Sequence, residues 1–368
     1  MLSRRAALIA ILFMGTCTAQ SALQTSLHEA VANNNEATQL AAEGRDAEAE
    51  KLYLAALNAG YDDDLDRAKV ASNLGLLYQR QDRYLDAERM FRDALRLRLK
   101  NLPPSSVQVA YSLNNLAEIY RIEGRDWESR NLMETAVRNL QLNKDAPGYP
   151  IVLSNLAVVL CRFKQFDDAE RLLRSALLSY EKRRQTDTRE YGVTINNLGQ
   201  VLENKKNLNA AASLYQQAIG IFKGVGAPAS TDLAAAFANT GELYQHLDRM
   251  EDARQAEQRA LELLRPYNNG ALRAQVLRNL GNILAKAGQP ADALPYFEQS
   301  LAIQEKTLGA EHLATAGLLL DYASATRRAG NPSLARKLRK RAMDLLARRN
   351  SQALDQMTVS LRDLRASK

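Results

Sequence analysis

A ladder of asparagines, each placed one turn into an expected helix, constrains this chain more than any other feature. Successive rungs lie 38 to 42 residues apart, and a glycine or alanine follows each rung two positions later. Self-similarity at a fixed period of about 40 residues is the signature of a repeat array, so one elongated stack is predicted rather than separate globular domains. The rungs are Asn35, Asn73, Asn115, Asn155, Asn197, Asn239, Asn279 and, on the eighth, Asp321.

The third repeat shows how each unit is expected to fold. Leu113, Leu116 and Tyr120 recur at helical spacing, Gly124 follows as a helix stop, and a second apolar face begins near Ser129. This pattern predicts two antiparallel helices joined by a tight turn. Small residues let the helix backbones approach, and one large residue in each second helix should fill the space between neighbouring repeats. These large residues include Tyr53, Phe91, Met133, Leu173, Tyr215 and Phe297.

The pattern Leu-(Gly/Ala)-x-x-Tyr in the first helix, followed by Ala-x-x-x-(Phe/Tyr)-x-x-Ala-Leu in the second, resembles the tetratricopeptide repeat. The resemblance covers residues 27–347. Repeat six departs from it through Thr240 and Glu257, and repeat eight through Thr326 and Arg339, which stand at core-type positions. The resemblance implies an all-α fold, a right-handed superhelical solenoid of about eight helix-turn-helix repeats.

Two stretches, residues 112–120 and 301–309, are similar to the kinesin-light-chain type of this repeat. The signal-like N-terminus argues against a kinesin subunit itself. The resemblance therefore points to exported bacterial proteins that share this repeat type.

Residues 1–19 are predicted to be a secretory signal peptide. Two arginines precede an uncharged apolar run, Ala6 to Met14, and small residues then lead to Ala19, the expected cleavage site. The run is short for a membrane span. An uncleaved anchor, a misplaced start and lipidation at Cys17 are the alternatives. Cleavage near Ala19 would place the protein in the periplasm or outside the cell.

The C-terminal segment, residues 351–366, is predicted to form a capping helix over the open end of the array. Leu354, Met357, Leu361 and Leu364 make one apolar stripe at helical spacing. Such a cap is expected because a terminal repeat lacks a neighbour to cover it. The alternative is a tail that binds a partner.

The end of the array is also strongly basic, within a chain of net charge +7. A basic patch can attract an anionic membrane, nucleic acid or an acidic partner. The alternative is a solvated face that binds no partner. Export and the lack of aromatic residues in the patch disfavour nucleic acid. The residues are Arg327, Arg328, Arg336, Lys337, Arg339, Lys340, Arg341, Arg348 and Arg349.

In the resembled family the first helices line a concave groove, which would place the asparagine ladder inside it. An amide both donates and accepts hydrogen bonds, so it can bracket a peptide backbone whatever its side chains. The alternative is that each asparagine bonds to the neighbouring repeat or to a connecting loop. The predicted groove residues are Asn73, Tyr111, Asn115, Arg121, Asn155, Arg162, Asn197, Gln200, Asn239, Asn279 and Asn282.

The sequence carries no arrangement typical of catalysis, metal binding or cofactor binding. His28, His246 and His312 fall in different repeats, and Cys161 is expected to be a buried, inert thiol. Nucleophile-elbow, phosphate-loop and dinucleotide motifs are missing. We therefore predict a non-catalytic scaffold, without cofactor or small-molecule substrate, that binds protein or peptide partners in its groove. The alternative is a structural cell-envelope component that contacts an anionic surface through the basic C-terminal end.

Overall fold

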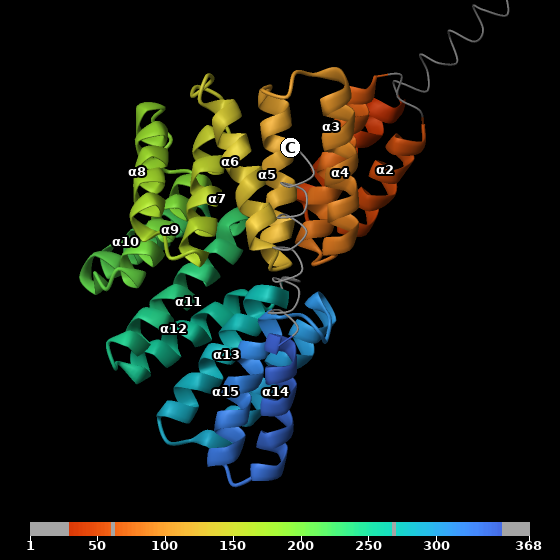
Figure 1. Ribbon diagram of the computed structural model, residues 1–368. Coiled ribbons are helices and arrows are strands. Elements are labelled where there is room, and N and C mark those ends of the chain that lie inside the picture. Colours follow the sequence, from red (N-terminus) through yellow and green to blue (C-terminus); the bar gives the residue numbers. More distant parts are fainter. Residues whose placement is uncertain (1–28, 60–62, 267–269, 348–368) are drawn as a thin grey trace, which may run out of the picture. The chain divides into compact units, whose positions relative to one another are not determined.

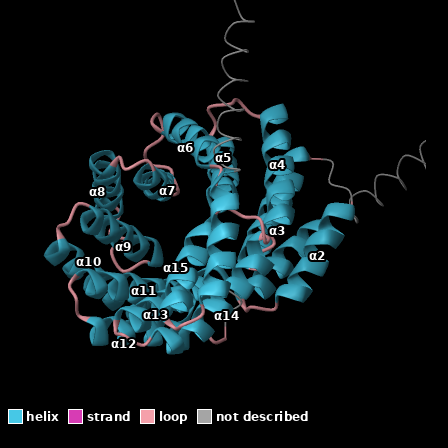
Figure 2. Ribbon diagram, turned by 60° about the horizontal axis from the view of Figure 1, so that its bottom comes forward, coloured by secondary structure: helices cyan, strands magenta, loops and turns pink. Residues whose placement is uncertain are grey.

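The computed structural model describes residues 29–59, 63–266 and 270–347, and over these residues the chain is helical without a strand (Figure 1). Short loops join consecutive helices (Figure 2). None of the described helices is both long and apolar enough to cross a membrane. The predicted signal peptide, residues 1–19, and the predicted capping helix, residues 351–366, lie outside the described residues.

Within the described residues, eight helix pairs follow one another, as the period predicts. The first helices are residues 29–42, α3 (Asp64–Arg80), α5 (Val107–Ile122), α7 (Tyr149–Arg162), α9 (Arg189–Asn204), α11 (Ser230–His246), α13 (Gly270–Lys286) and α15 (Ala314–Arg328). The second helices are α2 (Asp46–Asn58), α4 (Tyr84–Asn101), α6 (Asp126–Leu140), α8 (Phe166–Lys182), α10 (Leu208–Val225), α12 (Met250–Leu263), α14 (Pro290–Leu308) and residues 332–347. A short 3-10 helix, η1 (Ala227–Ala229), precedes α11. The fold is thus an all-α solenoid of helix-turn-helix repeats.

The array divides into two compact units, which we describe separately. The first comprises residues up to 119 together with 138–144, and the second comprises residues 120–137 together with those from 145 onward. In the second unit each first helix contacts the first helix of the next repeat, from α7 through α15, whereas consecutive described second helices show no comparable contact. The first helices therefore form the inner face of this unit.

All eight turns inside the repeats close in the same way. Each first helix ends in one residue with positive φ, and the next residue's N–H donates to a carbonyl five positions earlier, as Asn207 N–H does to Leu202 at 2.8 Å. This geometry is the Schellman motif, which satisfies carbonyls left open at a helix end. The left-handed residues are Gly44, Asp82, Gly124, Lys164, Lys206, Asp248, Gly288 and Gly330.

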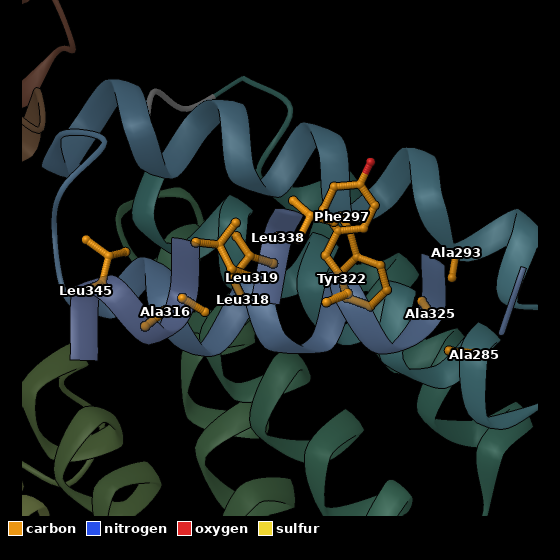
Figure 3. Close-up of a cluster of buried hydrophobic side chains, with 12 residues drawn as sticks. Ala285, Ala293, Phe297, Ala316, Leu318, Leu319, Tyr322, Ala325, Leu338 and Leu345 are labelled. Atoms are coloured by element: carbon orange, nitrogen blue, oxygen red, sulfur yellow. The ribbon is translucent and has the colours of Figure 1, made fainter. Parts of the chain in front are cut away.

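The small and large positions of the sequence pattern meet inside each repeat. A Cβ added to Gly199 would lie 2.6 Å from the ring of Tyr215, and one added to Gly281 would lie 2.9 Å from the ring of Phe297. Phe297 also stacks on Tyr322 of the next repeat, with 5.8 Å between ring centroids (Figure 3). The six predicted large residues are all buried, and Phe297 packs both on its own repeat and against the next.

Repeats six and eight depart from the apolar pattern, and the structure places their polar residues differently. Glu257 and Thr326 are fully buried at core positions. Arg339, in contrast, is exposed rather than in the core. Its long charged side chain remains in water, as is usual for arginine. Cys161 is half-buried, and burial raises the pKa of its thiol to about 11, so the thiol is protonated and unreactive at neutral pH.

Candidate partner-binding face

The asparagine ladder forms hydrogen bonds between successive repeats. In the second unit Asn197 Nδ2 donates to Ser154 Oγ at 3.1 Å, and Asn239 Nδ2 donates to Asn196 Oδ1 at 3.1 Å. Asn73 Nδ2 donates in the same way to Asn34 Oδ1 in the first unit, at 3.1 Å. Each acceptor stands immediately before the preceding rung. The structure therefore shows a directed bond from each of these rungs back to the repeat before it.

On the eighth rung the direction of the bond is reversed. Asp321 accepts from Arg278 Nε at 2.6 Å and from Asn282 Nδ2 at 3.2 Å. Arg278 stands immediately before the seventh rung, at the place where repeats one, four and five carry the acceptor for the next rung. Because a carboxylate can only accept, a donor is required at the facing position. The two changes compensate each other and preserve the link between repeats.

The carbonyl oxygens of two ladder asparagines remain available on the inner face. Among the described residues, no donor bonds to Oδ1 of Asn197 or Asn239, and neither oxygen is a buried unpaired atom. The side chain of Gln200, half-buried on the same face, has no partner in the described part of the chain. These groups can take hydrogen bonds from an extended backbone without breaking the links between repeats.

The other predicted groove residues are in varied surroundings. Arg162 is exposed and pairs with Asp126 of the preceding repeat. Asn115 accepts weakly from Asn114 at 3.4 Å. Half-buried positions are found for Tyr111, Arg121 and Asn155. Asn73, Tyr111 and Asn115 belong to the first unit, and the remaining predicted residues belong to the second.

Three glutamates lie close together on different helices of repeats five and six. Glu203 accepts from Tyr215 Oη at 2.7 Å and lies 2.8 Å from His246 Nδ1. Asn279 Nδ2 is shared between Oε1 of Glu242, at 3.0 Å, and Oε1 of Glu257, at 2.8 Å. We call these three carboxylates the acidic cluster. In the sequence, Glu257 is notable only because it departs from the repeat pattern. The spacing of residues along the chain does not predict that it lies near Glu242.

Burial governs the protonation of the acidic cluster. Burial raises the pKa of the Glu203 carboxyl, while its hydrogen bonds with Tyr215 and His246 act to lower it. Burial also raises the pKa of Glu257 well above its usual range, and the nearby charge of Glu242 adds to that rise. No group of three His, Cys, Asp or Glu side chains in the described residues is arranged to hold a metal ion.

The basic C-terminal end is partly engaged in structure. Arg341 Nη1 and Nη2 bond to Glu305 Oε1 at 2.5 Å and to the Ala310 carbonyl at 2.6 Å. Lys337, Arg339 and Lys340 are exposed. Within the described part of the chain these three form no ion pair, so their charges face solvent.

Comparison with known proteins identifies the family. Residues 28–100, 108–182, 190–265 and 272–348 match the sequence model of the tetratricopeptide repeat. This chain belongs to the tetratricopeptide repeat family. Protein KINESIN LIGHT CHAIN-RELATED 2 of Arabidopsis thaliana is 23% identical over 195 residues, which cover 50% of this chain and 28% of that protein. The chain thus spans about 28% of the length of this curated relative.

Solved structures share the fold. A Rap protein complexed with Competence and Sporulation Factor matches with a TM-score of 0.60 and 16% identity, covering 88% of this chain and 99% of that chain. The apo form of RapI matches with a TM-score of 0.55 and 11% identity, covering 77% and 99% of the two chains. At these identities the likeness shows a common helical-repeat fold.

Proposed function

We propose that this chain is a non-catalytic scaffold that holds an extended segment of a protein or peptide partner on the inner face of its second unit. The observation that carries the proposal is the set of amide oxygens, on Asn197, Asn239 and Gln200, that the links between repeats leave unbonded among the described residues. Amide oxygens suit a peptide backbone, because its N–H groups are present whatever the side chains. The family and the Rap neighbour, solved in complex with Competence and Sporulation Factor, support the same class of function.

The test compares matched arginine substitutions on two faces. Gln200→Arg places a bulky charge on the inner face, whereas Leu178→Arg places it on α8, where Leu178 is 57% exposed. Both variants should give the wild-type circular dichroism spectrum. Partners captured from the native envelope fraction and identified by mass spectrometry should be lost with Gln200→Arg and kept with Leu178→Arg. Equal capture by all three proteins would contradict inner-face binding.

We also propose that the scaffold is exported, with residues 1–19 removed. The supporting observation is the charge and hydropathy layout of that segment. Intact-mass measurement of protein from the native host should show a chain that begins at Gln20. A retained N-terminus would contradict cleavage, and a lipid-sized mass increase at Cys17 would identify an anchored form instead.

A second candidate function is peripheral contact with an anionic surface. It is favoured by the exposed, unpaired side chains of Lys337, Arg339 and Lys340 among the described residues. Sedimentation with vesicles of anionic lipid should fall in a Lys337→Glu/Lys340→Glu variant and be unaffected by Gln200→Arg. Absence of vesicle binding by the wild type would rule this candidate out.

A further inference from the structure

The acidic cluster lacks a permanent cation among the described residues. Elsewhere, carboxylates are paired with arginine, as Asp321 of the inner face is with Arg278 and Asp126 of α6 is with Arg162. Glu203 has only His246 as a basic neighbour, and neither Glu242 nor Glu257 forms an ion pair. Lys286, on the same helix as Asn279, donates to Gln245 Oε1 at 3.2 Å.

Two carboxylates of the cluster point toward one another. Because Glu242 and Glu257 accept from the same nitrogen of Asn279, at 3.0 and 2.8 Å, their oxygens converge on one point. If both carboxyls were ionised, two like charges this close would repel each other in a site with limited access to water, which favours the protonated form of Glu257. A cation placed between or beside them would relieve that repulsion.

Glu257 supplies independent evidence for an absent partner. Its side chain is 0% exposed, yet Oε2 has no hydrogen-bond partner in the described part of the chain. A Cβ on Gly241 would lie 2.8 Å from Glu257 Oε1, so the carboxyl group is seated directly against the backbone of α11, next to Glu242. A buried carboxyl oxygen without a hydrogen-bond partner is unfavourable, and in the ionised form of Glu257 the missing partner is an N–H or O–H donor.

We propose that the acidic cluster is a subsite for one cationic side chain, arginine or lysine, of the segment held on the inner face. The inference rests on the proposed function, since it assigns a chemical preference to one position of that segment. Half-buried Glu242 is the contact that the cation reaches first. A guanidinium or ammonium group fits better than a metal ion because the described residues offer no metal-ligand grouping here.

The subsite can be tested with argininamide, a probe that carries the cationic side chain without a peptide segment. Titration into the wild-type protein should shift the backbone amide NMR resonances of Gly241 and Asn279 saturably, and lysinamide should compete. Citrullinamide, whose side chain is neutral, should neither shift these resonances nor compete. Glu242→Gln should weaken binding about tenfold, the loss expected for one charged hydrogen bond. The matched control Glu262→Gln, on an exposed carboxylate of α12 that pairs with Arg259 at 3.6 Å, should bind as the wild type does.

Several outcomes would overturn the subsite. They are equal binding of citrullinamide, no saturable shift with argininamide, and an undiminished shift in Glu242→Gln. If Glu242→Gln fails to fold, Glu257→Leu serves as the second variant, because leucine occupies the equivalent position in repeat four as Leu173. Because the probe does not depend on partner capture, the subsite and the scaffold function can fail separately.

Discussion

Lys164 and Lys206 occupy left-handed turn positions, with φ of 59° and 64°, that four other repeats give to glycine. Glycine adopts positive φ without strain, so the turns at Gly44 and Gly124 can be predicted from the residue type. The turns at the two lysines can be recognised only from their position in the repeat. A side chain with a Cβ is disfavoured in this region by roughly 1–2 kcal/mol. The Schellman bonds at each turn are strong enough to hold it there.

At the residue scale, Lys206→Gly should stabilise the protein. The exposed Lys206 side chain has no partner among the described residues, so its removal loses no contact, while the left-handed backbone is relieved. The unfolded chain gains freedom, and the expected net gain is about 0.5 kcal/mol in free energy of unfolding. Urea denaturation followed by circular dichroism measures it. Gly288→Ala is the converse change, at φ of 83°, and should destabilise the protein. Stabilisation by both substitutions would contradict the explanation from backbone strain.

Glu257 gives a second prediction at this scale, which depends on pH. Burial raises the pKa of Glu257 in the folded state, so folding favours its protonated form. The contribution of Glu257 to the free energy of unfolding is therefore fully present below the pKa of the group in the unfolded chain, about 4.3. It is lost as the pH rises toward the higher pKa of the folded state. Glu257→Leu removes this dependence and should be more stable than the wild type by about 1–3 kcal/mol near pH 8.

Thermal denaturation at about pH 5 and about pH 8 checks this prediction, since the advantage of Glu257→Leu should grow with pH. The exposed control Glu262→Gln should show a difference from wild type that is small and nearly independent of pH. An advantage for Glu257→Leu that shrinks as pH rises would show that the carboxyl is stabilised in its charged form.

At the scale of the helical element, the sequence predicted the pairing of helices well and the bonds between pairs poorly. The period and the positions of the small residues are enough to predict which helices pair. The reason is that a small residue such as Gly199 leaves space that a large ring, here Tyr215, fills. The role of the ladder could not be decided from the sequence, because an amide can form hydrogen bonds to a partner or to a neighbouring repeat equally well. Spacing along the chain does not reveal that Ser154 and Asn196 face the next rung and take its donor. The inner-face roles of Gln200 and the free amide oxygens stay predictions.

Reversal of the bond on the eighth rung can be tested at this scale. Asp321→Asn alone weakens the pair with Arg278, whereas Arg278→Asn/Asp321→Asn recreates the amide pair seen between Asn196 and Asn239. Both partners are partly exposed, so we expect a coupling energy of about 1 kcal/mol in a double-mutant cycle. Chemical denaturation of the four proteins measures it. Strictly additive effects would show that the contact between α13 and α15 contributes nothing to stability.

At the scale of the whole molecule, stability in a repeat array is close to a sum of terms between nearest neighbours. In the second unit, from repeat four onward, each described repeat packs on the next, as Phe297 does on Tyr322. A terminal repeat has one such neighbour fewer, so it should be the first to open unless it is covered.

Removal of residues 351–368 tests whether the predicted capping helix provides that cover. We expect the truncated protein to melt at a lower temperature, with faster hydrogen exchange in α15 and residues 332–347 and unchanged exchange in α7. The reason is that apolar surface on repeat eight would become exposed to water. Identical melting and exchange would argue for a free tail that binds a partner.

The directed ladder also limits how an array of this kind can change its length during evolution. A duplicated copy of repeat five brings both its own rung and, one residue earlier, the group that the following rung needs, as Asn196 shows for Asn239. Repeats six and eight carry apolar Ala238 and Leu320 at that place. Behind repeat six, Glu242 accepts from the following rung, Asn279, instead. Duplication of repeat five therefore keeps its polar link intact, whereas a copy of repeat six or a repeat added behind repeat eight must take that link from another position.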